Sequence, residues 1–126
     1  MTNLDVANRF FNALLAGDGT ALNGLFSRDA VVWTNFSGKE QHRREFIPRF
    51  AALASTMPGL HFENVRRTAT PAGFVEQHTL CGETPDGGKL AAHGCFIVTV
   101  VDGRITRLNE YIDSGQLAPL TRRRAS

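Results

Sequence analysis

The chain has 126 residues, of which 42% are hydrophobic and 21% charged, and 14 Lys and Arg against 12 Asp and Glu give a net charge of +2. This balance excludes an intrinsically disordered chain and predicts one hydrophobic core. Arg122–Arg124 hold three of the positive charges, and no basic stripe crosses the rest, so we expect no nucleic-acid partner. The sequence has no apolar run of roughly 20 residues and no signal-peptide pattern at its start. We therefore expect no membrane association and a cytoplasmic protein.

Two amphipathic helices are predicted at the start of the chain. Apolar residues recur at three-and-four spacing over Asn3–Ala16, which predicts a helix of that length. Thr2 or Asn3 can cap its start, and Gly17 can end it. A tight corner follows, and a second, shorter helix is expected from Ala21 to Phe26.

The middle of the chain predicts one short strand and a third helix. Ala30–Asn35 is rich in β-branched and aromatic residues, which favour a strand. Helical spacing returns over Gln41–Ala54, where Pro48 is expected to kink the helix or to mark its start. Some of the larger apolar residues are expected to fill the core and others to line a cavity: Phe10, Phe11, Leu14, Phe46, Phe50 and Phe62.

Four further strands are predicted over residues 60–68, 73–81, 90–101 and 104–113. Pro85–Gly88 and Asp102–Gly103 are turn sequences in which glycine adopts positive φ without steric cost. Helices that precede a run of hairpin-connected strands predict an α+β fold with a meandering antiparallel sheet. Residues 1–120 are assigned to one domain and 121–126 to a disordered basic tail.

The last predicted strand and its turn, Asp102–Asp113, resemble the closing hairpin of the nuclear transport factor 2-like (NTF2-like) superfamily. The resemblance is to its SnoaL-like group, which includes polyketide cyclases, limonene-epoxide-hydrolase-like proteins and relatives of ketosteroid isomerase. It implies a cone-shaped α+β barrel, in which a bent antiparallel sheet wraps a long helix and encloses one central pocket. It also implies a homodimer that pairs through the convex side of the sheet.

The orientation of Glu110 fixes its strand, because side chains alternate across a strand. If Glu110 faces the pocket, so do Thr106, Leu108 and Ile112, while the outer face carries Ile105, Arg107, Asn109 and Tyr111. A three-residue loop with Gly103 in the left-handed conformation would place Val98, Phe96 and Gly94 opposite Thr106, Leu108 and Glu110. This register buries the more apolar face. A two-residue turn would instead bring His93 and Cys95 inward.

The resemblance also assigns residues to the pocket. Asn35 stands where epoxide-hydrolase-like members hold water with an Asn, and Glu110 stands where they have the Asp that acts as base. Trp33 replaces a Tyr, while Gln77 and Thr79 replace an Arg and an Asp. Because opening an epoxide needs a proton donor as well as a base, these replacements remove a group that limonene-type hydrolysis requires.

Glu110 is the expected catalytic base. Desolvation among Leu108, Phe96 and Ile112 would raise its pKa toward the range that suits a general base. The alternatives are a polar contact that orients a ligand and a structural hydrogen bond to Gln77 or Asn35.

For His78 and Trp33 the sequence allows more than one role. Alternation directs His78 outward, although a bulge would turn it inward as an acid–base partner. Trp33 is either a core residue or an aromatic wall for a ligand. The predicted site has Glu110, Asn35 and Gln77 as catalytic residues, and the predicted substrate-binding residues are Trp33, Thr79, Phe50, Phe96, Leu108 and His78.

The predicted function is a cofactor-independent enzyme that removes a proton next to a carbonyl, as isomerases and cyclases do. The substrate is expected to be a small apolar or polycyclic molecule. The alternatives are a non-catalytic ligand-binding module, an epoxide-hydrolase-like enzyme with an altered site, and a structural domain with a filled pocket. No metal site is expected, because Cys81 and Cys95 lie in no metal-binding motif. The outer row that would form the homodimer is Ile97, Thr99, Ile105 and Tyr111.

Overall fold

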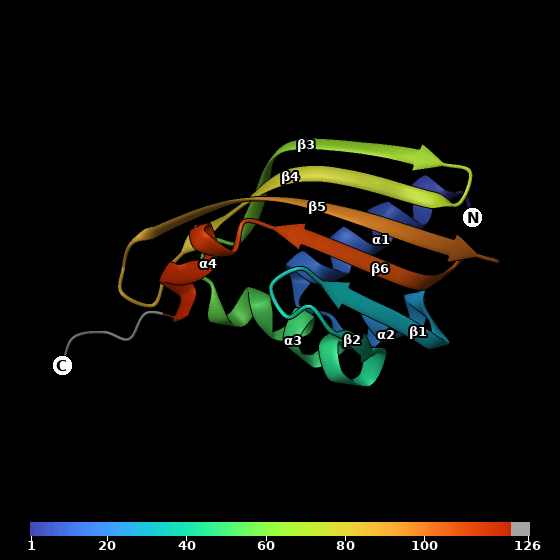
Figure 1. The fold of residues 1–126 in the computed structure, drawn as a ribbon, viewed down its shortest axis with the longest axis horizontal. Helices are drawn as coiled ribbons and strands as arrows, with labels where there is room; N and C mark the ends of the chain where they lie inside the picture. Colours follow the sequence, from blue (N-terminus) through green and yellow to red (C-terminus); the bar gives the residue numbers. More distant parts are fainter. Residues whose placement is uncertain (122–126) are drawn as a thin grey trace.

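The computed structural model describes residues 1–121 as four helices and one six-stranded sheet (Figure 1). The elements in chain order are α1 (Asn3–Ala16), α2 (Gly19–Leu25), β1 (Phe26–Thr34), β2 (Glu40–His42), α3 (Arg43–Thr56), β3 (His61–Thr70), β4 (Gly73–Glu83), β5 (Lys89–Val101), β6 (Arg104–Ile112) and α4 (Ser114–Thr121). The predicted tail, 121–126, lies outside the described residues apart from Thr121. Among the described helices, none is long and apolar enough to cross a membrane.

The sheet has the strand order β2-β1-β6-β5-β4-β3. All neighbouring strands are antiparallel except β1 and β6, which are parallel. The sheet is therefore mixed, whereas the sequence predicted an antiparallel one. The parallel pair arises because α3 and the β3–β5 meander separate β1 from β6 in the chain. The short strand β2 and the helix α4 were not predicted.

Helix α1 has the predicted bounds, and its caps explain them. The Thr2 hydroxyl accepts a hydrogen bond from the Asp5 backbone N–H (3.1 Å), and the Asp5 carboxylate accepts one from the Thr2 backbone N–H (2.8 Å). At the other end Gly17 adopts φ 66°, and a β-carbon there would lie 3.0 Å from the Ala51 carbonyl oxygen. A larger residue at this C-cap would be strained and would crowd α3.

The core lies between α1, α2, α3 and the inner face of the sheet. Phe10 of α1 is fully buried and makes edge-to-face contacts with Phe26, Phe50 and Phe96. A second apolar cluster, centred on Met57, Leu80 and Ile112, lies beside α4. Burial of these rings and aliphatic side chains holds the helices against the concave side of the sheet.

The β5–β6 hairpin differs from the predicted register. Asp102 (φ 51°) and Gly103 (φ 76°) form a two-residue turn in which Val101 pairs with Arg104. Positive φ at both positions matches the right-handed twist of the strands, which favours this turn over the predicted three-residue loop. The predicted register was therefore wrong.

A bulge at Thr106 then restores an apolar inner face. Val100 pairs with Ile105 and Thr99 with Arg107, so Thr106 is the extra residue. Because of this bulge both Ile105 and Leu108 are fully buried, although Ile105 was expected to face outward. Glu110 pairs with Phe96, where Gly94 was predicted.

Candidate functional site

A cavity of about 200 Å³ lies between α3, α4 and the inner face of the sheet near the ends of β1 and β6. Its lining is mostly apolar, and Glu110 is the acidic residue in it. The lining residues are Val32, Thr34, Phe36, Gln41, Phe46, Arg49, Phe50, Leu53, Leu80, Glu110, Ile112, Leu117 and Leu120. The cavity thus has the character of a site for a small apolar molecule with few polar anchors.

Glu110 lies in β6 between Thr34 of β1 and Phe96 of β5. Its backbone carbonyl accepts a hydrogen bond from the Asn35 N–H, but its carboxylate has no hydrogen-bond or ion-pair partner among the described residues. Desolvation by the apolar surroundings raises the pKa of this carboxyl to about 7. Glu110 can therefore both accept and return a proton near neutral pH.

Two other polar side chains line the cavity and were not predicted. Gln41 of β2 is half-buried, and Arg49 of α3 is exposed at the cavity edge. The Thr34 hydroxyl also lines it, but is engaged with Ser37 Oγ at 2.8 Å. The sequence offered little signal for either residue, because β2 is only three residues long and Arg49 lies off the apolar face of its helix. Phe50 lines the cavity, whereas Phe96 and Leu108 lie in the core and are absent from its lining.

Asn35, predicted to be catalytic, is hydrogen-bonded to the backbone of β6. Its side-chain nitrogen donates to the Ile112 carbonyl, and its side-chain oxygen accepts from the Ile112 N–H, both at 2.9 Å. The amide therefore acts as an additional pair of ladder hydrogen bonds at the end of β1. The second N–H of the amide is not used in this pair, but Asn35 does not line the Glu110 cavity.

Strand β4 presents the opposite face from the one expected. Gln77 is exposed, and the hydroxyl of Thr79 lies 3.2 Å from His93 Nδ1 on the outer face. Glu76 and His78 are buried on the inner face, without the bulge that was thought necessary to turn His78 inward. The orientations predicted for Gln77, Thr79 and His78 were therefore wrong. The family pattern misled here because Phe74 and Leu80 fix the inward alternation, and Glu76 follows it.

The buried Glu76 is tolerated because it has two partners. Arg67 Nε donates to one carboxylate oxygen at 2.5 Å, and His78 Nδ1 lies 2.6 Å from the other. The Arg67 guanidinium also stacks over the Phe11 ring at 4.5 Å and donates to Asn8 Oδ1 at 2.7 Å. This polar cluster ties α1 to β3 and β4, and none of its members lines the Glu110 cavity.

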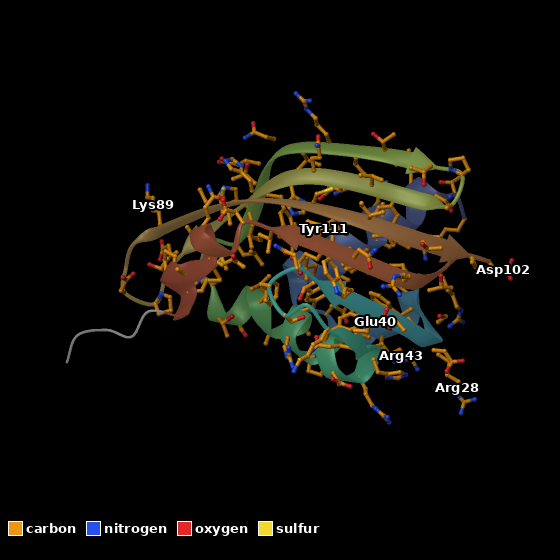
Figure 2. All side chains as sticks on the ribbon, in the orientation of Figure 1. Arg28, Glu40, Arg43, Lys89, Asp102 and Tyr111 are labelled. Atoms are coloured by element: carbon orange, nitrogen blue, oxygen red, sulfur yellow. The ribbon has the colours of Figure 1, made fainter. Side chains whose placement is uncertain are left out.

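Trp33 lies on the outer face of the sheet, not in the cavity. Its ring contacts that of Tyr111 at 5.2 Å between centroids, and Figure 2 shows Tyr111 on β6. Val32 and Thr34, its neighbours in β1, are the residues that reach the cavity. The orientation predicted for Trp33 was therefore wrong, because the alternation of β1 is one residue out of step with the expected one.

His93 and Cys95 also lie outside the cavity. The two-residue turn was expected to bring them inward, but the Thr106 bulge reverses this effect and Cys95 pairs with Tyr111. His93 is exposed and Cys95 is half-buried.

The chain matches the model of the SnoaL-like domain over residues 7–108. Among solved structures it is similar to IdmH from Streptomyces antibioticus, a proposed polyketide cyclase, with 18% identity, coverage of 97% of this chain and 100% of that one, and a TM-score of 0.81. An NTF2-like protein from Burkholderia xenovorans LB400 gives 20% identity, 95% coverage of both chains and a TM-score of 0.77. No curated protein matches the sequence significantly.

A third similar structure, from Catenulispora acidiphila, has a ketosteroid isomerase-like fold and was solved in complex with trimethylamine. It gives 17% identity, coverage of 88% of this chain and 86% of that one, and a TM-score of 0.72. At such identities these likenesses show the fold alone, which is the predicted NTF2-like α+β cone with an open, mixed sheet. The match to the family model covers most of the sequence, and the chain therefore belongs to the SnoaL-like family.

Proposed function

We propose that this protein is a cofactor-independent enzyme that removes a proton next to the carbonyl of a small apolar substrate, with Glu110 as the base. The observation that carries the proposal is an unpartnered carboxylate that faces an apolar cavity. The Glu110 side chain is half-buried, and its pKa of about 7 suits proton transfer at neutral pH. The SnoaL-like family supports a cyclase or isomerase type of chemistry.

The proposed reaction begins when ionised Glu110 takes a proton from the carbon next to the carbonyl. The electron pair of that C–H bond moves into the carbonyl, and an enolate forms. The Gln41 amide and the Arg49 guanidinium are the donors that line the cavity, and we assign them to the developing oxygen charge. They replace Asn35, Gln77 and Trp33, which do not line it.

The enolate then has two productive fates. Protonated Glu110 can return its proton to a different carbon, which completes an isomerisation. Alternatively, the enolate carbon attacks a second carbonyl of the same molecule, and the resulting alkoxide takes the proton from Glu110, which completes an aldol-type cyclisation. Either route regenerates the Glu110 carboxylate.

The cavity volume narrows the proposed substrate class. An engineered protein cavity of roughly 150 Å³ holds one benzene molecule, and the cavity here measures about 200 Å³. The best fit is therefore a single ring with short substituents. A polycyclic substrate would need α4 or the segment around Phe36 to move outward, since Leu117, Leu120 and Phe36 line the cavity.

The alternative of a non-catalytic binding module is favoured by one observation. The three residues expected to polarise an oxygen lie outside the cavity, and one of its remaining donors, Arg49, is exposed to solvent. Epoxide hydrolysis gains no such support, because among the described residues the cavity lining contains one carboxyl group and no second acid to protonate the epoxide oxygen.

Hydrogen–deuterium exchange next to a carbonyl tests the proposal directly. A panel of monocyclic ketones is incubated in deuterated buffer with the protein, and deuterium incorporation is followed by NMR. At least one ketone is expected to exchange, and Glu110→Gln is expected to lower the rate by about 10²-fold or more. Glu45→Gln, which changes an exposed acid on α3, is the control and should exchange like the wild type.

Two results would count against catalysis. If ketones shift the methyl resonances of Leu53 or Ile112 without any exchange, the cavity binds ligands and does not transform them. If the folded Glu110→Gln variant exchanges at the wild-type rate, Glu110 is not the base.

A further inference from the structure

Three potential metal ligands meet on the outer face of the sheet, away from the Glu110 cavity. His61 and Glu63 lie two residues apart on the same face of β3, and Cys81 is the cross-strand partner of His61 on β4. One ligand atom from each residue lies within 4.8 Å of the other two. Imidazole, carboxylate and thiolate together form a donor set that suits Zn²⁺.

The His61 ring is held in the orientation that a metal ligand needs. Its Nδ1 lies 2.7 Å from the Gly59 carbonyl oxygen, which can only accept a hydrogen bond, so Nδ1 carries the proton. This leaves Nε2 directed toward Glu63 Oε1, at 3.1 Å. Metal-binding histidines commonly have this arrangement, in which a backbone carbonyl fixes the ring and the tautomer from behind.

The Cys81 thiol lies against the same carboxylate. Cys81 is only 7% exposed, and burial together with the charge of Glu63 raises the pKa of its thiol. Hydrogen bonds from His61 and Cys81 lower the pKa of Glu63. A divalent cation at this point would be held by a neutral imidazole, a carboxylate and a thiolate.

The cluster opens onto a surface hollow that has room for a fourth ligand. The hollow measures about 410 Å³ and is also lined by Gly59, Glu83 and Lys89. Figure 2 shows Lys89 at the end of the molecule opposite Asp102. Zinc–ligand bonds of roughly 2.0–2.3 Å imply ligand atoms about 3.3–3.8 Å apart in a tetrahedral site. The His61 and Glu63 side chains are 53% and 59% exposed, so they have freedom to close the remaining distance.

We propose that His61, Glu63 and Cys81 bind Zn²⁺, with a water molecule in the fourth position. The site is independent of the proposed reaction at Glu110, because its residues lie on the other face of the sheet. Because the thiolate is the form of cysteine that binds metal, zinc binding displaces the thiol proton of Cys81.

Cobalt(II) provides the first test, since it takes zinc sites and gives a thiolate-to-metal charge-transfer band. The reduced, metal-free protein is titrated with Co²⁺ and the near-ultraviolet absorption is recorded. A band that saturates at one equivalent and is displaced by Zn²⁺ is expected for the wild type. Cys95→Ser, which removes the other free cysteine, on β5, is the matched control and should keep the band. Cys81→Ser should lose it.

Zinc affinity, measured by competition with a chromophoric chelator, provides the second test. His61→Ala should weaken binding by at least about tenfold, whereas His93→Ala should bind like the wild type. Glu110→Gln should also bind like the wild type, so a failed catalytic proposal leaves this one intact. Absence of the charge-transfer band, full binding by Cys81→Ser, or equal losses in His61→Ala and His93→Ala would each overturn the proposal.

Discussion

Glu110 and Glu76 lie on either side of Phe96 in one row across three strands of the inner sheet face. Two strand spacings separate them by roughly 10 Å. Glu76 is fully buried and paired with Arg67 and His78, whereas the Glu110 carboxylate has no partner among the described residues. The same residue type therefore has two roles in this row: Glu76 holds structure together, and Glu110 is left free for a ligand.

Protein stability should depend on pH through Glu110. The pKa in the folded state is raised to about 7, above the roughly 4.3 of an unfolded chain. Between these values the folded state retains a proton that the unfolded state has released. The free energy of unfolding should therefore fall as pH rises through this window, by roughly 3–4 kcal/mol for this group. Denaturant titrations at several pH values should show this fall in the wild type and not in Glu110→Gln. Identical pH dependence in both proteins would contradict the raised pKa.

The rate of catalysis should depend on the same ionisation of Glu110, but it should rise with pH where stability falls. If ionised Glu110 removes the proton, kcat/KM for an exchanging ketone should rise with pH and level off above about pH 8. A pH–rate profile of the wild type measures this. A profile that falls as pH rises through 7 would mean that the protonated acid is the active form.

The Arg67–Glu76 pair should matter greatly for stability. Arg67→Ala leaves the Glu76 charge buried with His78 as its remaining partner, and breaking a buried pair in this way costs about 3 kcal/mol. Arg66→Ala is the matched control, because Arg66 is adjacent in the chain but exposed on the outer face. Its cost should stay within about 0.5 kcal/mol. Equal losses in the two variants, measured by chemical denaturation, would refute a special role for the buried pair.

Asn35 should affect stability more than turnover. Asn35→Ala removes two hydrogen bonds to the Ile112 backbone, which should cost about 1–3 kcal/mol. Asn35→Asp keeps the acceptor and loses the donor, so its cost should be intermediate. Asn109→Ala removes one outer-face hydrogen bond from Arg107 and is the mild control. A folded Asn35→Ala protein with turnover reduced as far as in Glu110→Gln would restore the catalytic role.

The homodimer remains a prediction, and we propose that it forms through the outer face of the sheet. Ile97 and Tyr111 are 47% and 43% exposed there, and Trp33 packs beside Tyr111. Ile105 was expected in this row, but it is buried and is therefore not part of the outer surface. Light scattering should give the mass of a dimer for the wild type and of a monomer for Ile97→Lys. A wild-type monomer throughout a concentration series would contradict it.

Local sequence signals predicted much of the fold. Helix α1 has the expected bounds because Thr2, Asp5 and Gly17 supply its caps within the chain itself. The position of the turn at Asp102–Gly103 was likewise predicted, because these residues tolerate positive φ. The closing hairpin and the order of elements were enough to identify the SnoaL-like family, and Glu110 was placed in an apolar environment that raises its pKa.

The faces of the strands could not be predicted equally well. A single bulged residue, Thr106, reverses the alternation that follows it, and its position depends on which apolar side chains the core can accept. The prediction for β4 failed for a related reason. Glu76 and His78 read as outward-facing polar residues, but Arg67, nine residues earlier, makes their burial tolerable.

The sequence by itself determined the caps of α1 and the positions of the turns, because these depend on residues close together in the chain. It also indicated the family and the choice of Glu110 as the acid of the pocket. Tertiary structure decided which side chains share a face. It placed Gln41 and Arg49 at the cavity, engaged Asn35 with Ile112, and brought His61 beside Cys81 across two strands. Such contacts depend on strand register and on ion pairs between residues that are far apart in the chain. Both are settled only when the core packs.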